Sequence, residues 1–255
     1  MASFNKFAVL FERGFKQAIR PYLALMPEFL MPPFYFVINS AAFQKVIEIP
    51  GFDQVSYLQF YAPVALLIAI FVSSGATGLE VVTDISTGFM DRIFLTPVNR
   101  WFIVFSKLFA VGLKSTLLVA IMMGLLILFG ASFHGGILGL LLIFLISFIF
   151  AMGWAGIGLF IAFTTKNPRV LQSSFILFFP FSFITTSQLP LSLLSGWYKT
   201  AVQANPVTYI LEAIRSVLIQ GQINSVYWVG LLVAVGFALI TLSLSAFTFK
   251  RSIIR

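Results

Sequence analysis

Long apolar stretches constrain this chain more than any other feature of its sequence. A membrane-spanning helix needs about 20 mainly apolar residues to cross a hydrocarbon core of roughly 30 Å. Five windows meet this requirement, at 57–79, 103–129, 137–163, 170–189 and 226–249. A sixth, 23–43, is apolar but carries Glu28 and three prolines, so we expect it to begin as an irregular or kinked segment that straightens after Pro33. The sequence therefore predicts an all-α integral membrane protein, a single domain over 1–255 with six transmembrane helices.

Composition supports this prediction. Hydrophobic residues make up 60% of the chain and charged residues only 9%, against roughly a quarter in soluble domains. The 16 Lys and Arg outnumber the 8 Asp and Glu, which favours an anionic membrane surface over nucleic acid in so apolar a chain. The absence of cysteine excludes disulfides, Cys-ligated zinc and a thiol nucleophile.

The positions of the basic residues predict the orientation. With six spans, thirteen Lys and Arg fall on one side and three, Lys45, Lys199 and Arg215, on the other. Cytoplasmic flanks are enriched in these residues. We therefore expect a multi-pass protein of the cytoplasmic membrane with both termini in the cytoplasm.

The first segment, 1–22, predicts an amphipathic helix lying on the membrane surface. Helical periodicity gathers most of its apolar side chains on one face and its basic side chains on the opposite face. The apolar set is Phe4, Phe7, Ala8, Phe11, Phe15, Ala18, Ile19 and Tyr22, and the basic set is Lys6, Arg13, Lys16 and Arg20. The spread of the basic residues is unlike a cleavable signal peptide, so we expect the segment to be retained.

The segment 83–100 predicts a short helix that docks into another protein. Asp84 and Asp91 lie seven positions apart, on one face of a helix, and Pro97 ends the element. A solvated loop is the alternative, but it would leave several large apolar side chains in water. These are Ile85, Phe89, Met90, Ile93, Phe94 and Leu95.

This segment also carries a family resemblance. The pattern formed by Asp84, Gly88, Asp91, Arg92, Ile93, Thr96, Pro97, Val98 and Arg100 resembles the cytoplasmic loop of type-2 ABC exporter permeases, including the antibiotic-resistance group. The stretch 205–215 and the glycine-rich fourth span are similar to that family as well, so the resemblance covers essentially the whole chain. The chain departs from the family at Val82, Thr83 and Asp84, where Glu-Arg pairs are frequent.

The resemblance implies a transmembrane subunit that pairs with a separate ATP-binding subunit and dimerises with itself or a related permease. The docking contacts would come from the N-terminal helix and from Asp84, Gly88, Phe89, Asp91, Arg92, Ile93, Thr96, Pro97 and Arg100. We expect ATP and Mg²⁺ on the partner and no cofactor on this chain, which has no phosphate-binding loop and no visible catalytic constellation. By itself it is not expected to be an enzyme.

Charged residues within the apolar windows need a separate explanation, because charge at the bilayer centre is costly. Arg100, Lys107 and Lys114 recur every seven residues along one helix face. We expect Arg100 and Lys107 to reach the headgroups, and Lys114 to face the bundle interior or an anionic substrate headgroup. The segment 190–222 predicts short external re-entrant helices, with Glu212 and Arg215 paired.

The second and fifth spans are the predicted substrate path, because aromatic rings can line a route for a hydrophobic molecule and small residues let helices approach closely. The alternative is that the phenylalanines face lipid and the glycines simply pack. The residues of the path are Ser73, Ser74, Thr77, Lys114, Phe175, Phe178, Phe179 and Phe183. Drug, lipid and lipid-linked glycan all suit such a path. A secondary transporter or channel and a lipid-modifying enzyme are the competing functions, disfavoured by the lack of an evident ionisable relay or catalytic cluster.

Overall fold

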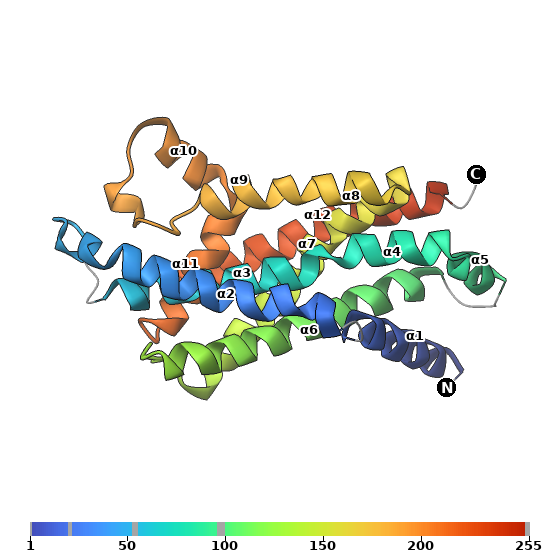
Figure 1. Ribbon diagram of the computed structural model, residues 1–255, viewed down its shortest axis with the longest axis horizontal. Helices are drawn as coiled ribbons and strands as arrows, with labels where there is room; N and C mark the ends of the chain where they lie inside the picture. The colour runs from blue at the N-terminus through green and yellow to red at the C-terminus, as the bar shows by residue number, and fades with distance from the viewer. Residues whose placement is uncertain (1, 20–21, 53–55, 96–99, 253–255) are drawn as a thin grey trace.

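The computed structural model describes residues 2–19, 22–52, 56–95 and 100–252, and the regular elements in these ranges are all helical. Figure 1 shows an elongated bundle whose long helices run along one axis. Within this described part, four helices are long and apolar enough to cross a membrane, namely Tyr57–Ser86, Phe102–Leu128, Gly136–Thr165 and Ser225–Phe249. They correspond to α3 (Tyr57–Gly75) with α4 (Thr77–Ser86), α6 (Arg100–Leu128), α7 (Gly136–Thr165) and α12 (Ser225–Ser252).

The two other predicted spans differ from expectation. The helix α2 (Tyr22–Ala42) is continuous through Pro27, Pro32 and Pro33, so of the predicted irregular or kinked start the irregular form is wrong. The window 170–189 is divided into α8 (Pro168–Ser174), the 3₁₀ turn η2 (Phe175–Leu177) and α9 (Phe178–Phe183). Both segments lie lengthwise along the bundle beside the longer helices (Figure 1).

The helix α3 forms the centre of the core. In its most apolar window 72% of the residues are buried, against 28% for α12. It packs against α2, α6 and α7, and α7 in turn packs against α12. Burial on every side explains why α3 is apolar around its whole circumference, which is the pattern of a core helix.

Glycines allow two pairs of helices, α4 with α7 and α7 with α12, to come close. A Cβ atom added to Gly78 would lie 2.6 Å from the carbonyl oxygen of Gly158, so the backbones of α4 and α7 nearly touch. Gly153 and Gly156 approach Ala238 and Thr241 of α12 in the same way. The expectation that small residues of the second span serve close helix packing agrees with this geometry.

One end of the bundle carries short helices. These are η1 (Gln44–Glu48), η3 (Leu191–Leu193), α10 (Gly196–Ala204) and α11 (Pro206–Leu218). The predicted breaks at Gly196 and Asn205–Pro206 coincide with the starts of α10 and α11. The α11 helix is largely buried, whereas α10 stands out from the body in Figure 1.

Asn205 joins the start of α11 to the end of α9. Its Nδ2 donates hydrogen bonds to the carbonyl oxygens of Phe181 (3.2 Å) and Ile184 (2.6 Å), at the end of α9. Its Oδ1 accepts from the backbone N–H of Val207 at 3.0 Å and so caps α11. One side chain thus satisfies groups that both helix ends would otherwise leave without partners.

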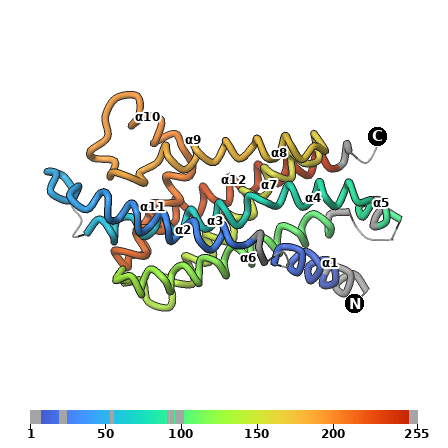
Figure 2. The backbone as a smooth tube through the Cα atoms, in the orientation of Figure 1, coloured from blue at the N-terminus to red at the C-terminus, as the bar shows by residue number. Residues whose placement is uncertain are grey.

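The opposite end holds α1 (Ala2–Ile19), α5 (Phe89–Phe94) and the last turns of α12 (Figure 2). The α1 helix packs against α6, with the rings of Phe11 and Phe109 in edge contact at 5.7 Å and Ala18 buried.

Candidate functional site

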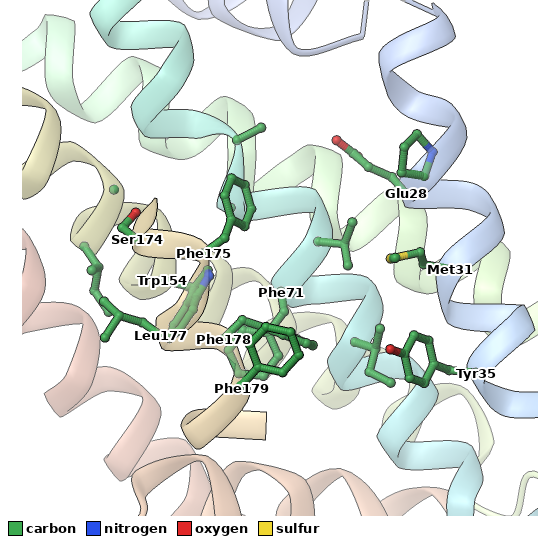
Figure 3. Close-up of a pocket in the computed structure, with 17 residues that line it drawn as sticks. Glu28, Met31, Tyr35, Phe71, Trp154, Ser174, Phe175, Leu177, Phe178 and Phe179 are labelled. Atoms are coloured by element: carbon green, nitrogen blue, oxygen red, sulfur yellow. The ribbon is translucent and has the colours of Figure 1, made fainter. Parts of the chain in front are cut away.

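A cavity of about 390 Å³ lies between α2, α3, α7 and the α8–α9 segment. Figure 3 shows its two facing walls, with Glu28, Met31 and Tyr35 on α2 and Phe175, Phe178 and Phe179 opposite them. Large apolar cavities with a few polar groups are the usual form of a small-molecule site.

Aromatic rings build the deep wall. The ring of Phe71, on α3, meets Trp154 edge-on at 4.5 Å and Phe178 at 5.2 Å. Phe175 lies over Gly75, where an added Cβ would come within 3.0 Å of its ring. The absence of a side chain at Gly75 therefore gives Phe175 its place on the wall.

The structure brings only part of the predicted substrate path to this cavity. Phe175, Phe178 and Phe179 line it, whereas Phe183 is not among the lining residues and stacks on Phe179 at 6.0 Å. The cavity reaches α3 through residues that the sequence analysis did not assign to the path, including Ile68, Phe71 and Val72.

The three small polar residues of the predicted path lie away from the cavity. Ser73, Ser74 and Thr77 are buried and form hydrogen bonds within the protein, and none of them lines the cavity. Ser73 Oγ lies 2.6 Å from Ser115 Oγ on α6, and Ser74 Oγ donates to the carbonyl oxygen of Ile70. Their position indicates helix packing.

Lys114, the last residue of that prediction, faces the bundle interior. Its Nζ lies 2.9 Å from Glu28 Oε1, and both residues are less than 8% exposed. Glu28 lines the cavity and Lys114 does not. This pair was not predicted from sequence, although the one carboxylate of α2 and a lysine deep in the apolar α6 were the available signal, because buried charges require partners.

A second cluster of charge joins α1, α4 and α6. Asp84 Oδ1 accepts hydrogen bonds from Arg13 (3.0 Å) and Gln17 (3.2 Å), and its Oδ2 lies 3.1 Å from Lys107 Nζ. Lys107 also pairs with Glu80 at 3.3 Å. The prediction that Lys107 reaches the headgroups is therefore wrong, because two carboxylates of the same chain hold it 92% buried.

The predicted docking segment 83–100 is divided between the end of α4 and a separate short helix, α5. The α4 helix ends at Ser86, Gly88 has a positive φ of 68°, and α5 follows as a separate helix, so one continuous docking helix is not formed. Phe89 lies beneath the guanidinium of Arg13, 3.2 Å from the ring centroid, and Arg92 is exposed. Thr96 and Pro97, together with the side chains of Asp91, Ile93 and Arg100, lie outside the described residues.

A third polar group lies near α10 and α11. The predicted pairing of Glu212 with Arg215 is confirmed, and Arg215 Nη2 also donates to the carbonyl oxygen of Thr186 at 3.0 Å. The guanidinium lies 4.1 Å from the ring of Phe60, and Glu212 and Arg215 border a second cavity of about 600 Å³. These bonds tie α11 to the segment after α9.

Comparison with known proteins finds similarity over most of the chain. The model of the family described as "ABC-2 family transporter protein" matches residues 9–247. The chain is 29% identical over 214 residues to a protein named as the transport permease ycf38 of Cyanophora paradoxa, covering 81% of this chain and 72% of the relative.

Two further relatives carry drug-resistance names. The daunorubicin resistance ABC transporter permease protein DrrB1 of Streptomyces coeruleorubidus is 27% identical, over 86% of this chain and 74% of its own length. DrrC of Mycobacterium tuberculosis, named as a doxorubicin resistance ABC transporter permease protein, is 21% identical over 81% and 74% of the two chains. Since the family model matches almost the whole sequence, the chain is a multi-pass membrane protein that belongs to the ABC-2 family of transporter proteins.

Proposed function

We propose that this chain is the transmembrane subunit of an ATP-driven exporter and that it moves a hydrophobic or amphipathic molecule across the cytoplasmic membrane. The observation that carries the proposal is the aromatic cavity between α2, α3 and α9, in a chain of a transporter family. ATP and Mg²⁺ would bind a separate subunit. A cavity of about 390 Å³ suits part of a drug-sized or lipid-like molecule.

The end of the bundle with α1, α4 and α5 is the proposed contact with the ATP-binding subunit. Asp84 is 4% exposed and already holds Arg13 and Lys107, so it would transmit movement within the chain instead of touching the partner. Among the exposed residues of this end are Arg92 and Leu95 of the segment at α5, the latter 87% exposed. A movement of α5 would reach α1 and α6 through this cluster.

The proposed topology has six crossings, with α2 and the α8–α9 segment added to the four long helices. Two observations support it. Both extra segments run lengthwise along the bundle (Figure 1). The helix α1 lies at the same end of the bundle as the C-terminal end of α12, and two chain ends on one side of a membrane require an even number of crossings. A homodimer or a heterodimer with a related permease would complete the path.

Reporter fusions test the topology. Fusions after Phe52 and Lys199 should report an external location, and fusions after Thr96, Asn167 and Arg255 a cytoplasmic one, because thirteen of sixteen basic residues then lie inside. A cytoplasmic reporter signal after Phe52 would remove α2 from the set of crossings and overturn the orientation.

Transport itself is tested by reconstitution with a candidate ATP-binding subunit. We expect ATP-dependent accumulation of an amphipathic dye in inside-out vesicles, and its loss on Phe178→Ala, which removes a ring from the cavity wall. Phe247→Ala removes an exposed ring of α12 and serves as the matched control. Hydrolysis of ATP by the isolated chain, or equal transport by both variants, would contradict the proposal.

The buried Glu28–Lys114 pair favours one alternative, a secondary transporter driven by protons, because ionisable groups within membrane helices are typical of proton relays. The same vesicles distinguish the two. Dye movement that persists without nucleotide and stops when a protonophore is added would support the alternative and reject ATP-driven export.

A further inference from the structure

We infer that the cavity between α2, α3 and α9 selects amphipathic organic cations, and that Glu28 is the group that selects them. The inference rests on the proposed function in treating the occupant of the cavity as the transported molecule, and it adds the chemical class of that molecule.

The charge of the cavity lining carries the first step. Seventeen of the described residues line the cavity, and Glu28 is the single charged residue among these seventeen. The other groups able to form hydrogen bonds through their side chains are the hydroxyls of Tyr35 and Ser174 and the indole of Trp154. An anionic ligand would therefore meet a carboxylate and no basic side chain, whereas a cation would meet an opposite charge.

Lys114 does not cancel this preference. It approaches Glu28 from α6 and is not a lining residue, and its Nζ is bound to Oε1 of the carboxylate. Among the described residues, Oε2 has no hydrogen bond to a protein group. Lys114 thus holds Glu28 in place from behind the cavity while the carboxylate borders the cavity itself, as Figure 3 shows for its position on α2.

The aromatic wall supplies the second step. Phe71, Phe175, Phe178 and Phe179 line the cavity across from Glu28 (Figure 3). The negative faces of aromatic rings attract cations, and this attraction strengthens when water is excluded. The same rings bury an apolar body, so the arrangement fits a molecule with a positive centre and a hydrophobic or aromatic frame.

Binding of tetraphenylphosphonium tests the inference without any partner subunit. The purified full chain in an uncharged detergent is titrated calorimetrically with tetraphenylphosphonium and, in separate runs, with tetraphenylborate, which carries the same four rings and the opposite charge. We expect saturable binding of one phosphonium ion per chain, at least about ten-fold tighter than any saturable binding of the borate. Saturable binding that is equal or tighter for the borate would overturn the inference.

Variants assign the effect to Glu28. Glu28→Gln keeps the shape of the side chain and should weaken phosphonium binding at least about ten-fold, whereas Lys114→Met should bind it no more weakly than the wild type. A purely structural pair would make the two substitutions equally harmful, which would also overturn the inference. Glu12→Gln, which removes an exposed charge of α1, is the control for net charge. The double variant Glu28→Gln with Lys114→Met leaves no unpaired buried charge, and it should show the same loss if the single variant fails to fold.

The outcome is separable from that of the proposed function. Glu28-dependent binding without ATP-dependent export would support the cation site and reject the exporter. Export of neutral or anionic dyes with no dependence on Glu28 would support the exporter and reject the cation site.

Discussion

Replacement of Gly78 by alanine should loosen the contact between α4 and α7. The added Cβ would lie 2.6 Å from the carbonyl oxygen of Gly158 and 2.5 Å from Leu171 Cδ2, whereas ordinary contacts begin at 3.4 Å. The backbones must therefore separate by roughly 0.8 Å, the difference between 3.4 and 2.6 Å. Overpacking of this kind costs about 1–3 kcal/mol, which corresponds to a fall of roughly 2–12 °C in the unfolding midpoint for a chain of this length.

Gly124→Ala is the matched control, because it adds the same methyl group within α6 where, beyond its chain neighbours and the backbone of its own helix, no heavy atom of the described residues lies within 4 Å. Because alanine favours the helix more than glycine does, the unfolding midpoint of this variant should be unchanged or slightly raised. The measurement is the fraction of purified protein that stays monodisperse in size-exclusion chromatography after heating across a temperature series. If Gly78→Ala retains a midpoint equal to that of Gly124→Ala, the two helices are not in the close contact described.

Two further stability predictions use the same assay. Asp84→Ala leaves Arg13 and Lys107 with one carboxylate fewer and should cost about 3 kcal/mol, whereas Glu12→Ala, at an exposed ion pair, should cause no measurable change. Asn205→Ala removes the cap shared by α9 and α11 and should cost about 2 kcal/mol, more than Asn224→Ala, which caps α12 at the surface. Equal midpoints within either pair of variants would refute the role assigned to Asp84 or to Asn205.

The long helices were predictable from sequence because a single property, an unbroken apolar run of sufficient length, determines them. The fate of 170–189 was not. The helix α9 ends at Phe183, just before the polar run 185–188, and Asn205 donates hydrogen bonds to carbonyl groups at that end. No local pattern places Asn205 beside them. The helix α2 differs from its prediction in the other direction. Its prolines predicted an irregular or kinked start, but the helix runs through them without a break.

Local sequence patterns also could not predict which charged residues of different helices pair with each other. Helical spacing correctly predicts that Glu212 and Arg215 pair, because they lie on the same helix three positions apart. The contacts of Lys107 with Asp84 and of Lys114 with Glu28 join different helices, 23 and 86 positions apart. They depend on how each helix is rotated about its axis, which the near-uniform hydrophobicity of α2 and α6 leaves undetermined.

The hydrogen bond between Ser73 and Ser115 has a consequence for biogenesis. The two hydroxyls lie 42 positions apart and are buried against each other, so the α3 hydroxyl has no α6 partner while the ribosome is still synthesising the intervening chain. Ser73 therefore enters the translocon with only the carbonyl oxygen of Ile70 in its own helix as a partner. Glu28 enters before its ammonium partner, which arrives 86 residues later. Early helices of this chain would therefore gain by staying beside the insertion machinery until α6 emerges.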